Sequence, residues 1–227
     1  MNLDVTVAHS VEQVGQEAWD RLSAGRPFTS YRWYRFGERA MEHATPIYIL
    51  LSYAGETVAR ATFWCSGREV LWFSPALAYP IEGALRVWPM MICQSPISTT
   101  STSGLILPEG PLRLEAIKTI LDVAQEIGRK KRVSFYAFPY LEDGQVADEW
   151  PAGCLKIQIS GAGTQLDIRW PDVDGYLAHL NKKRRYNLRR NLRFSAEEGL
   201  VVRRRDEVDI DLAMQLHRLT NKRYGSR

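Results

Sequence analysis

The sequence predicts an α/β fold in which a mixed, largely antiparallel sheet is flanked by helices. Three observations support this prediction. Residues 3–25 change from the two-residue apolar period of a strand to the period of a helix. Residues 46–65 form two β-rich runs joined by Ala-Gly-Glu, as in a hairpin. Residues 111–131 carry the clearest helical pattern, and an apolar strand-like run follows them at 132–139.

Capping residues and apolar spacing place the N-terminal elements. Residues 3–9 alternate like a strand. Ser10 is a suitable N-cap for a helix that ends at Gly25, and Ser30 is a suitable N-cap for a second helix over 31–44. The apolar face of this second helix is expected to consist of Trp33, Phe36 and Ala40.

The later elements follow from the same signals. Helix 111–131 has basic residues in its last turn, where the helix dipole favours them. A helix over 171–199 is expected to start at Pro171 or Asp172 and to end at Gly199. A last helix starts near Asp209 or Asp211. Further strands are expected at 69–75, 88–93, 104–108, 154–160, 164–170 and 200–208. The expected apolar faces are Leu114, Ile117, Ile120 or Leu121 and Ala124 in the first of these helices, and Leu212, Met214 or Leu216 and Leu219 in the last.

Composition excludes several classes of protein. With 227 residues, 45% of them hydrophobic, the chain can bury an ordinary globular core. Its start has no apolar signal segment and no run is apolar enough to span a bilayer, so a cytoplasmic location is expected. The three cysteines and four histidines show none of the usual ligand spacings, and we predict no metal site.

Positive charge is concentrated in one segment. Lys182 to Arg193 contains seven Lys/Arg in twelve residues. Lys182 to Arg205 contains ten Lys/Arg against two Glu, a local balance of +8, which leaves −4 for the rest of a chain whose total is +4. The basic character is therefore local, and it calls for a local explanation.

Two interpretations of this segment compete. On a helix, Arg185, Arg189 and Arg193 line one side, where their like charges repel one another. A solvated surface helix partly paired with nearby acids is the simpler interpretation. An anionic, phosphate-bearing ligand is favoured because no acid interrupts the seven charges. The buried stripe of this helix is expected to be Leu177, Leu180, Leu188 and Leu192.

Three stretches carry a resemblance to a known family. They are "PFTSYRWYRFGE", "GTQLDIRWP" and "YLAHLNKKRRYNLRRNLRFSAEEGLVVRR". Together they resemble the FemAB-like, peptidoglycan-bridge branch of the GNAT acyltransferase superfamily. The resemblance implies a GNAT-like lobe at 1–169. It also implies that residues 170–227 hold a basic helix, a strand and the start of a second, incomplete lobe.

The resemblance also implies an activity. It implies an N-acyltransferase that moves an acyl or aminoacyl group to an amine or hydroxyl of an anionic acceptor, such as a cell-envelope precursor. Acyl-CoA or aminoacyl-tRNA is the implied donor, although no R-x-x-G-x-G/A loop occurs and "SGAGTQ" leads into a strand. No catalytic base is assigned. The residues expected to bind substrate are Lys183, Arg185, Tyr186, Asn187 and Arg189, with Trp33 and Arg35 as weaker candidates.

Two further classes of partner remain open. An arginine-rich helix with Asn187 and Asn191 could contact nucleic acid, but the net acidic remainder of the chain argues against specific binding. The same helix could lie on an anionic membrane surface, with Leu188, Leu192 and Phe194 as apolar contacts. Either partner would make this chain a binding module without catalysis. The oligomeric state is not predicted.

Overall fold

The computed structural model describes residues 3–23, 26, 28–66, 89–97, 102–133, 135–141, 150, 167–201 and 209–224. The chain forms two compact units. The first unit is Met1–Gly153 with Asp209–Arg227, and the second unit is Cys154–Val208. The strands expected at 69–75 and 154–160, and parts of those at 164–170 and 200–208, lie outside the described residues, whereas 167–169 are described and are not a strand.

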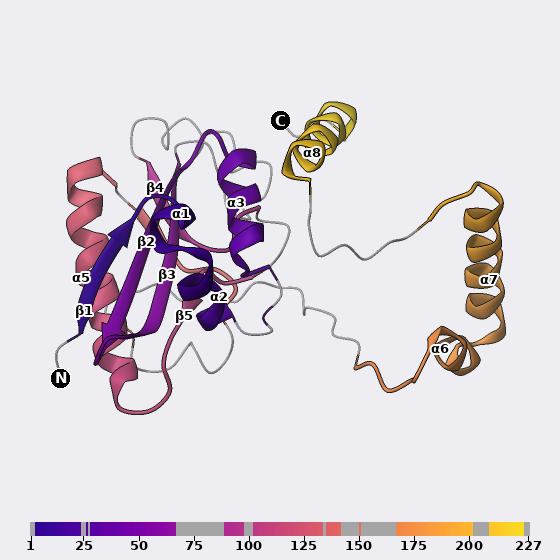
Figure 1. Cartoon of the computed structure of the whole chain (residues 1–227), viewed down its shortest axis with the longest axis horizontal. Coiled ribbons are helices and arrows are strands. Elements are labelled where there is room, and N and C mark those ends of the chain that lie inside the picture. The colour runs from indigo at the N-terminus through magenta and orange to yellow at the C-terminus, as the bar shows by residue number, and fades with distance from the viewer. Residues whose placement is uncertain are drawn as a thin grey trace. The chain divides into compact units, whose positions relative to one another are not determined.

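The first unit contains a mixed sheet between helical layers, which confirms the predicted α/β class (Figure 1). In the described residues the order is β1-β2-β3-β4-β6, and β5 also pairs with β3. All pairs are antiparallel except β4 with β6. The strands are β1 Asp4–Ala8, β2 Thr45–Tyr53, β3 Glu56–Ser66, β4 Met90–Cys93, β5 Leu105–Ile106 and β6 Phe135–Ala137.

Local sequence signals account for the hairpin and for the helix starts. The β2–β3 hairpin turns at Ala54 and Gly55, whose positive φ angles of 52° and 83° suit a tight two-residue turn. Each helix start predicted from a cap has that cap, a side chain that accepts a backbone N–H: Ser10, Ser30, Asp172 and Asp209. The helices are α1 Val11–Val14, α2 Gln16–Ser23, α3 Tyr31–Ala40, α5 Leu112–Lys131, α6 Val173–His179, α7 Lys182–Glu197 and α8 Ile210–Tyr224.

Two helices that the sequence predicts as continuous are interrupted. The helix expected from Ser10 to Gly25 breaks at Gly15, whose φ of 84° ends α1 before α2 begins. The helix expected over 171–199 breaks at Leu180, which is extended. Asn181 then caps α7 by accepting the N–H of Arg184 at 3.0 Å. A local cap competes with helix continuation, and apolar periodicity does not detect it.

The sheet buries a different core on each face. Ile47, Ile49 and Leu51 pack toward α5, and the alternate residues of β2, Tyr48 and Leu50, pack toward α1–α3. Helix α5 buries its predicted stripe, although Leu114 is exposed. Helix α3 buries Tyr34 and Gly37, whereas the predicted Trp33, Phe36 and Ala40 are half-buried. Helix α3 also ends at Ala40, before the predicted residue 44, and β6 is partly exposed, not fully buried as a core strand would be.

A buried arginine ties the helical layer to the sheet. Arg60 on β3 is 1% exposed, and its guanidinium lies 3.9 Å from the centre of the Trp19 ring. Its nitrogens donate to the carbonyl oxygens of Trp19 and Thr29 at 3.2 and 3.3 Å, and to Ser23 Oγ. None of these partners is a carboxylate. Burial lowers the pKa of Arg60, and the ring faces and carbonyl oxygens compensate the charge in place of an acid.

Replacing Arg60 by Ala should therefore destabilise the first unit by about 3 kcal/mol. The substitution opens a cavity beside Trp19 and removes the hydrogen bonds that join β3 to the carbonyl oxygens of Trp19 and Thr29 and to Ser23 Oγ. Chemical denaturation would measure the loss. The matched control is Arg35→Ala, which removes an exposed ion pair with Glu12 and should cost less than about 1 kcal/mol. Equal effects of the two substitutions would contradict the structural role of Arg60.

Candidate functional site

Helix α7 carries the cationic segment on its surface. It spans Lys182–Glu197 and contains no buried residue. At 3.6 residues per turn, all of its Lys/Arg side chains except Arg184 project from one half of the helix. We name this half the cationic face. Its members are Lys182, Lys183, Arg185, Arg189, Arg190 and Arg193, and Tyr186 lies near their centre.

The cationic face has no acidic partner among the described residues. No ion pair joins an α7 cation to a described carboxylate. The first turn of α7 contains no acid and its last turn no base, the reverse of what a helix dipole favours. Arginines spaced at i, i+4 add about 0.2–0.5 kcal/mol of repulsion for each adjacent pair. The isolated helix would be more stable with a different charge pattern, and a bound anion would offset both costs.

The apolar side chains of α7 are exposed. Leu188 and Leu192, which we expected in a buried stripe, are 37% and 52% exposed within the described structure. Only Leu177, on α6, is buried as expected. The break at Leu180 ends the stripe, because α6 and α7 do not share one helical axis. Tyr186 and Phe194 are also exposed, at 60% and 62%.

Helix α7 groups five of the predicted binding residues, namely Lys183, Arg185, Tyr186, Asn187 and Arg189. Arg185 is half-buried and donates to the carbonyl oxygen of Leu180 at 3.1 Å, so it also supports the corner between α6 and α7. Asn187 lies beside the cationic face and is exposed. Of the five, Arg185 is the one whose side chain has a hydrogen bond in the described structure.

Trp33 and Arg35, the other two predicted residues, lie on α3 in the first unit. Trp33 Nε1 donates to Ser95 Oγ at 3.0 Å, and its ring contacts Phe28 and Phe36. Arg35 forms a 2.9 Å ion pair with Glu12. Both side chains thus have structural partners within this unit, and the candidate site does not include them.

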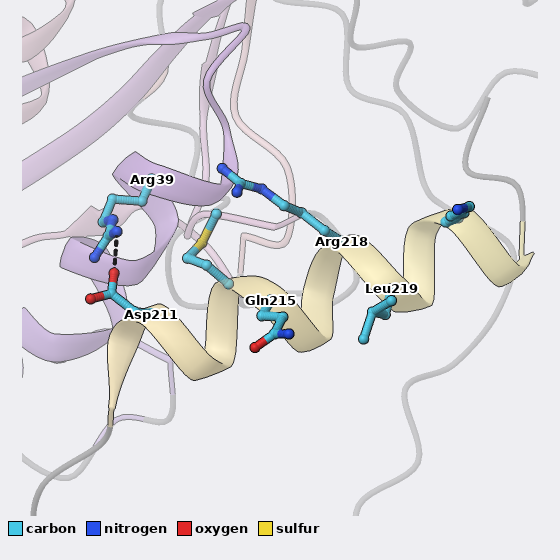
Figure 2. A pocket seen from close by; sticks show the side chains of 7 residues that line it. Arg39, Asp211, Gln215, Arg218 and Leu219 are labelled. Carbon is cyan, nitrogen blue, oxygen red and sulfur yellow. Dashed lines mark hydrogen bonds and ion pairs between the residues drawn. The ribbon is translucent and has the colours of Figure 1, made fainter.

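A shallow groove of 320 Å³ lies between α3 and α8. Figure 2 shows Arg39 facing Asp211 at the start of α8, with Arg218 directed toward α3. Arg218 also pairs with Glu42 at 3.0 Å. Sequence patterns do not predict this groove, because its contacts join residues that are 172 and 176 positions apart in the chain. Carboxylates compensate both arginines, so the groove attracts an anion less strongly than α7 does.

The buried tyrosine and cysteine that the structure describes in the first unit do not resemble a catalytic base. Burial raises the pKa of Tyr34 to about 12 and also raises that of Cys93, so both stay protonated near neutral pH. The Glu38 carboxylate accepts hydrogen bonds from Val11 N–H, Ser10 Oγ and Tyr48 Oη. Among the described residues no cluster of His, Cys, Asp or Glu has the composition of a metal site.

The fold places this chain among α/β proteins, and its helix α7 exposes a cationic surface. The chain belongs to the FemAB-like family, whose model, described as peptidoglycan biosynthesis/recognition, matches residues 10–224. No curated protein and no solved structure gives a significant match. In the described residues, none of the helices is both long and apolar enough to cross a membrane.

Pyrophosphate should order α7. At low ionic strength and several times its Kd, it should increase the hydrogen-exchange protection of α7 amides about fivefold, because a bound anion offsets the repulsion on the cationic face. Mass spectrometry of the exchanged peptides would measure this change. Helix α5, which has Glu115 in its first turn and bases in its last, serves as the internal control. The same protection in sodium chloride of matched ionic strength would argue against an anion site.

Proposed function

We propose that this protein is an acyl or aminoacyl transferase that modifies an amine or hydroxyl of an anionic peptidoglycan precursor. In this proposal, the cationic face of α7 binds the diphosphate of that acceptor. The observation that carries the proposal is the uncompensated charge of α7, together with membership of a family of peptidoglycan biosynthesis and recognition.

The chemistry of a diphosphate matches this surface. Guanidinium groups bind phosphate oxygens through two parallel charge-assisted hydrogen bonds. Arg189 and Arg193 are one helical turn apart, so they could contact neighbouring phosphate groups. Tyr186 lies next to them and is exposed, so its ring can contact the nucleoside or sugar attached to the diphosphate. Precursors that carry a nucleotide or a lipid on a diphosphate share this recognition element.

The family resemblance implies acyl-CoA or aminoacyl-tRNA as the acyl donor. No described residues are assigned to bind this donor. Helix α5 follows β4 and β5. Because a helix N-terminus can bind phosphate, the start of α5 is a place where the pyrophosphate of a donor could bind. Pro108 and Pro111 have no N–H to offer there, and Glu109 adds a negative charge. The start of α5 therefore does not fit a donor pyrophosphate. We derive no catalytic step through either donor.

Replacing Arg189 and Arg193 together by Ala should weaken binding of a nucleotide-diphosphate-linked peptidoglycan precursor by at least about tenfold, because two charge-assisted contacts are lost. Titration calorimetry at about 50 mM salt would measure the Kd. This pair is preferable to Arg185→Ala with Arg189→Ala, because Arg185 also holds the carbonyl of Leu180. The latter pair should weaken binding as well, with some loss of α7 helicity.

The control variant Arg129→Ala with Lys131→Ala removes the same charge from the end of α5. It should bind the precursor like the unsubstituted protein if recognition is local to α7. Transfer of a radiolabelled acyl group to the precursor, from acyl-CoA or from aminoacyl-tRNA, would establish the reaction. If the α5 and α7 variants weakened precursor binding equally, net charge alone would explain the effect. This result would refute a binding site on α7.

A further inference from the structure

We propose that α7 docks the protein on an anionic lipid bilayer. The bilayer partner is distinct from the precursor of the proposed function, although both would use the same arginines. Diphosphate binding leaves a second feature of α7 unexplained, namely its exposed apolar side chains.

The described part of the second unit exposes several large apolar side chains. Its large apolar side chains that lie open to solvent are Ile168, Val173, Tyr186, Leu188, Leu192, Phe194, Leu200 and Val201. Scattered single apolar residues need no explanation, but a group of this size on one short segment is typical of a contact surface. A soluble diphosphate would cover few of these side chains.

Charge and apolar side chains alternate around α7 in an order that suits a bilayer. Leu188 and Leu192 border the cationic face on one side, and Phe194 borders it on the other. Long basic side chains can reach phosphate headgroups while the leucines of the one border enter the boundary with the acyl chains; Phe194, on the opposite border, cannot enter at the same time. Tyr186, in the middle of the cationic face, is a residue type that is enriched at this depth.

The same surface is less suited to nucleic acid. Phosphates of RNA or DNA would attract the arginines, and Tyr186 could stack on a base. Leu188, Leu192 and Val173 would gain little from such a partner, because aliphatic side chains provide no stacking surface. A bilayer accounts for the cations and for the aliphatic residues together.

Vesicle sedimentation of the full chain without precursor tests this inference. Vesicles of phosphatidylcholine with about one third phosphatidylglycerol should bind the protein, and vesicles of phosphatidylcholine alone should not. The variant Arg189→Ala with Arg193→Ala should lower the partition coefficient about 25-fold, because each arginine near an anionic surface contributes a factor of about five. The variant Leu188→Ser with Leu192→Ser should lower it by about tenfold.

The apolar variant separates this inference from the proposed function. Loss of vesicle binding with unchanged precursor affinity would support docking through the apolar border. The control Leu212→Ser with Leu216→Ser makes the same kind of change on exposed leucines of α8 and should leave vesicle binding unchanged. Three results would each overturn the inference: vesicle binding that is insensitive to Leu188→Ser with Leu192→Ser, equal binding to neutral vesicles, and retention of RNA in preference to anionic vesicles. Precursor binding could still hold in each case.

Discussion

The arrangement of the first unit depends on one buried positive charge. Arg60 extends from β3 into the helical layer, where carbonyl oxygens of Trp19 and Thr29 and the face of the Trp19 ring surround it. A guanidinium deprived of water needs all of these partners, so α2 and the chain before α3 cannot shift independently. Helix α3 is then fixed by the hydrogen bond between Tyr34 Oη and Thr62 Oγ1, and α8 packs on α3 through Met214.

The arginines of this protein occur in three different environments. Comparing these environments indicates which of the arginines a ligand would stabilise. Arg60 is buried, and acceptors and ring faces of the first unit surround its two terminal nitrogens, whereas its Nε has no hydrogen-bond partner among the described residues. The arginines between α3 and α8 are exposed but face Asp211 and Glu42. Those of α7, apart from the half-buried Arg185, are exposed, and all are crowded on one helix without a described carboxylate; the helix dipole repels the ones in the first turn. In this third arrangement several like charges repel one another, and no described group offsets the repulsion.

Two partners of the FemAB-like chain would meet at the same helix. A peptidoglycan precursor presents a diphosphate, and an anionic leaflet presents many phosphates in a plane; both satisfy guanidinium groups. What separates them is the apolar border of Leu188 and Leu192, which a soluble precursor leaves in water. If the acceptor is linked to lipid, docking would bring α7 to the surface from which that acceptor's headgroup projects. The two proposals are thus compatible, but each rests on its own set of side chains.

The sequence by itself determined what is local: the strand and helix periods, the caps Ser10, Ser30, Asp172 and Asp209, the hairpin turn and the cationic run. These signals act over a few residues, so periodicity and composition reveal them. Periodicity alone missed the break at Leu180, where an asparagine cap prevailed over a continuous apolar pattern. Only the tertiary structure decided that Tyr34 rather than Trp33 faces the core, that Arg60 is buried, and that α8 returns to α3. The reason is physical: each depends on packing between segments distant in the chain, and no short stretch of sequence encodes that partnership.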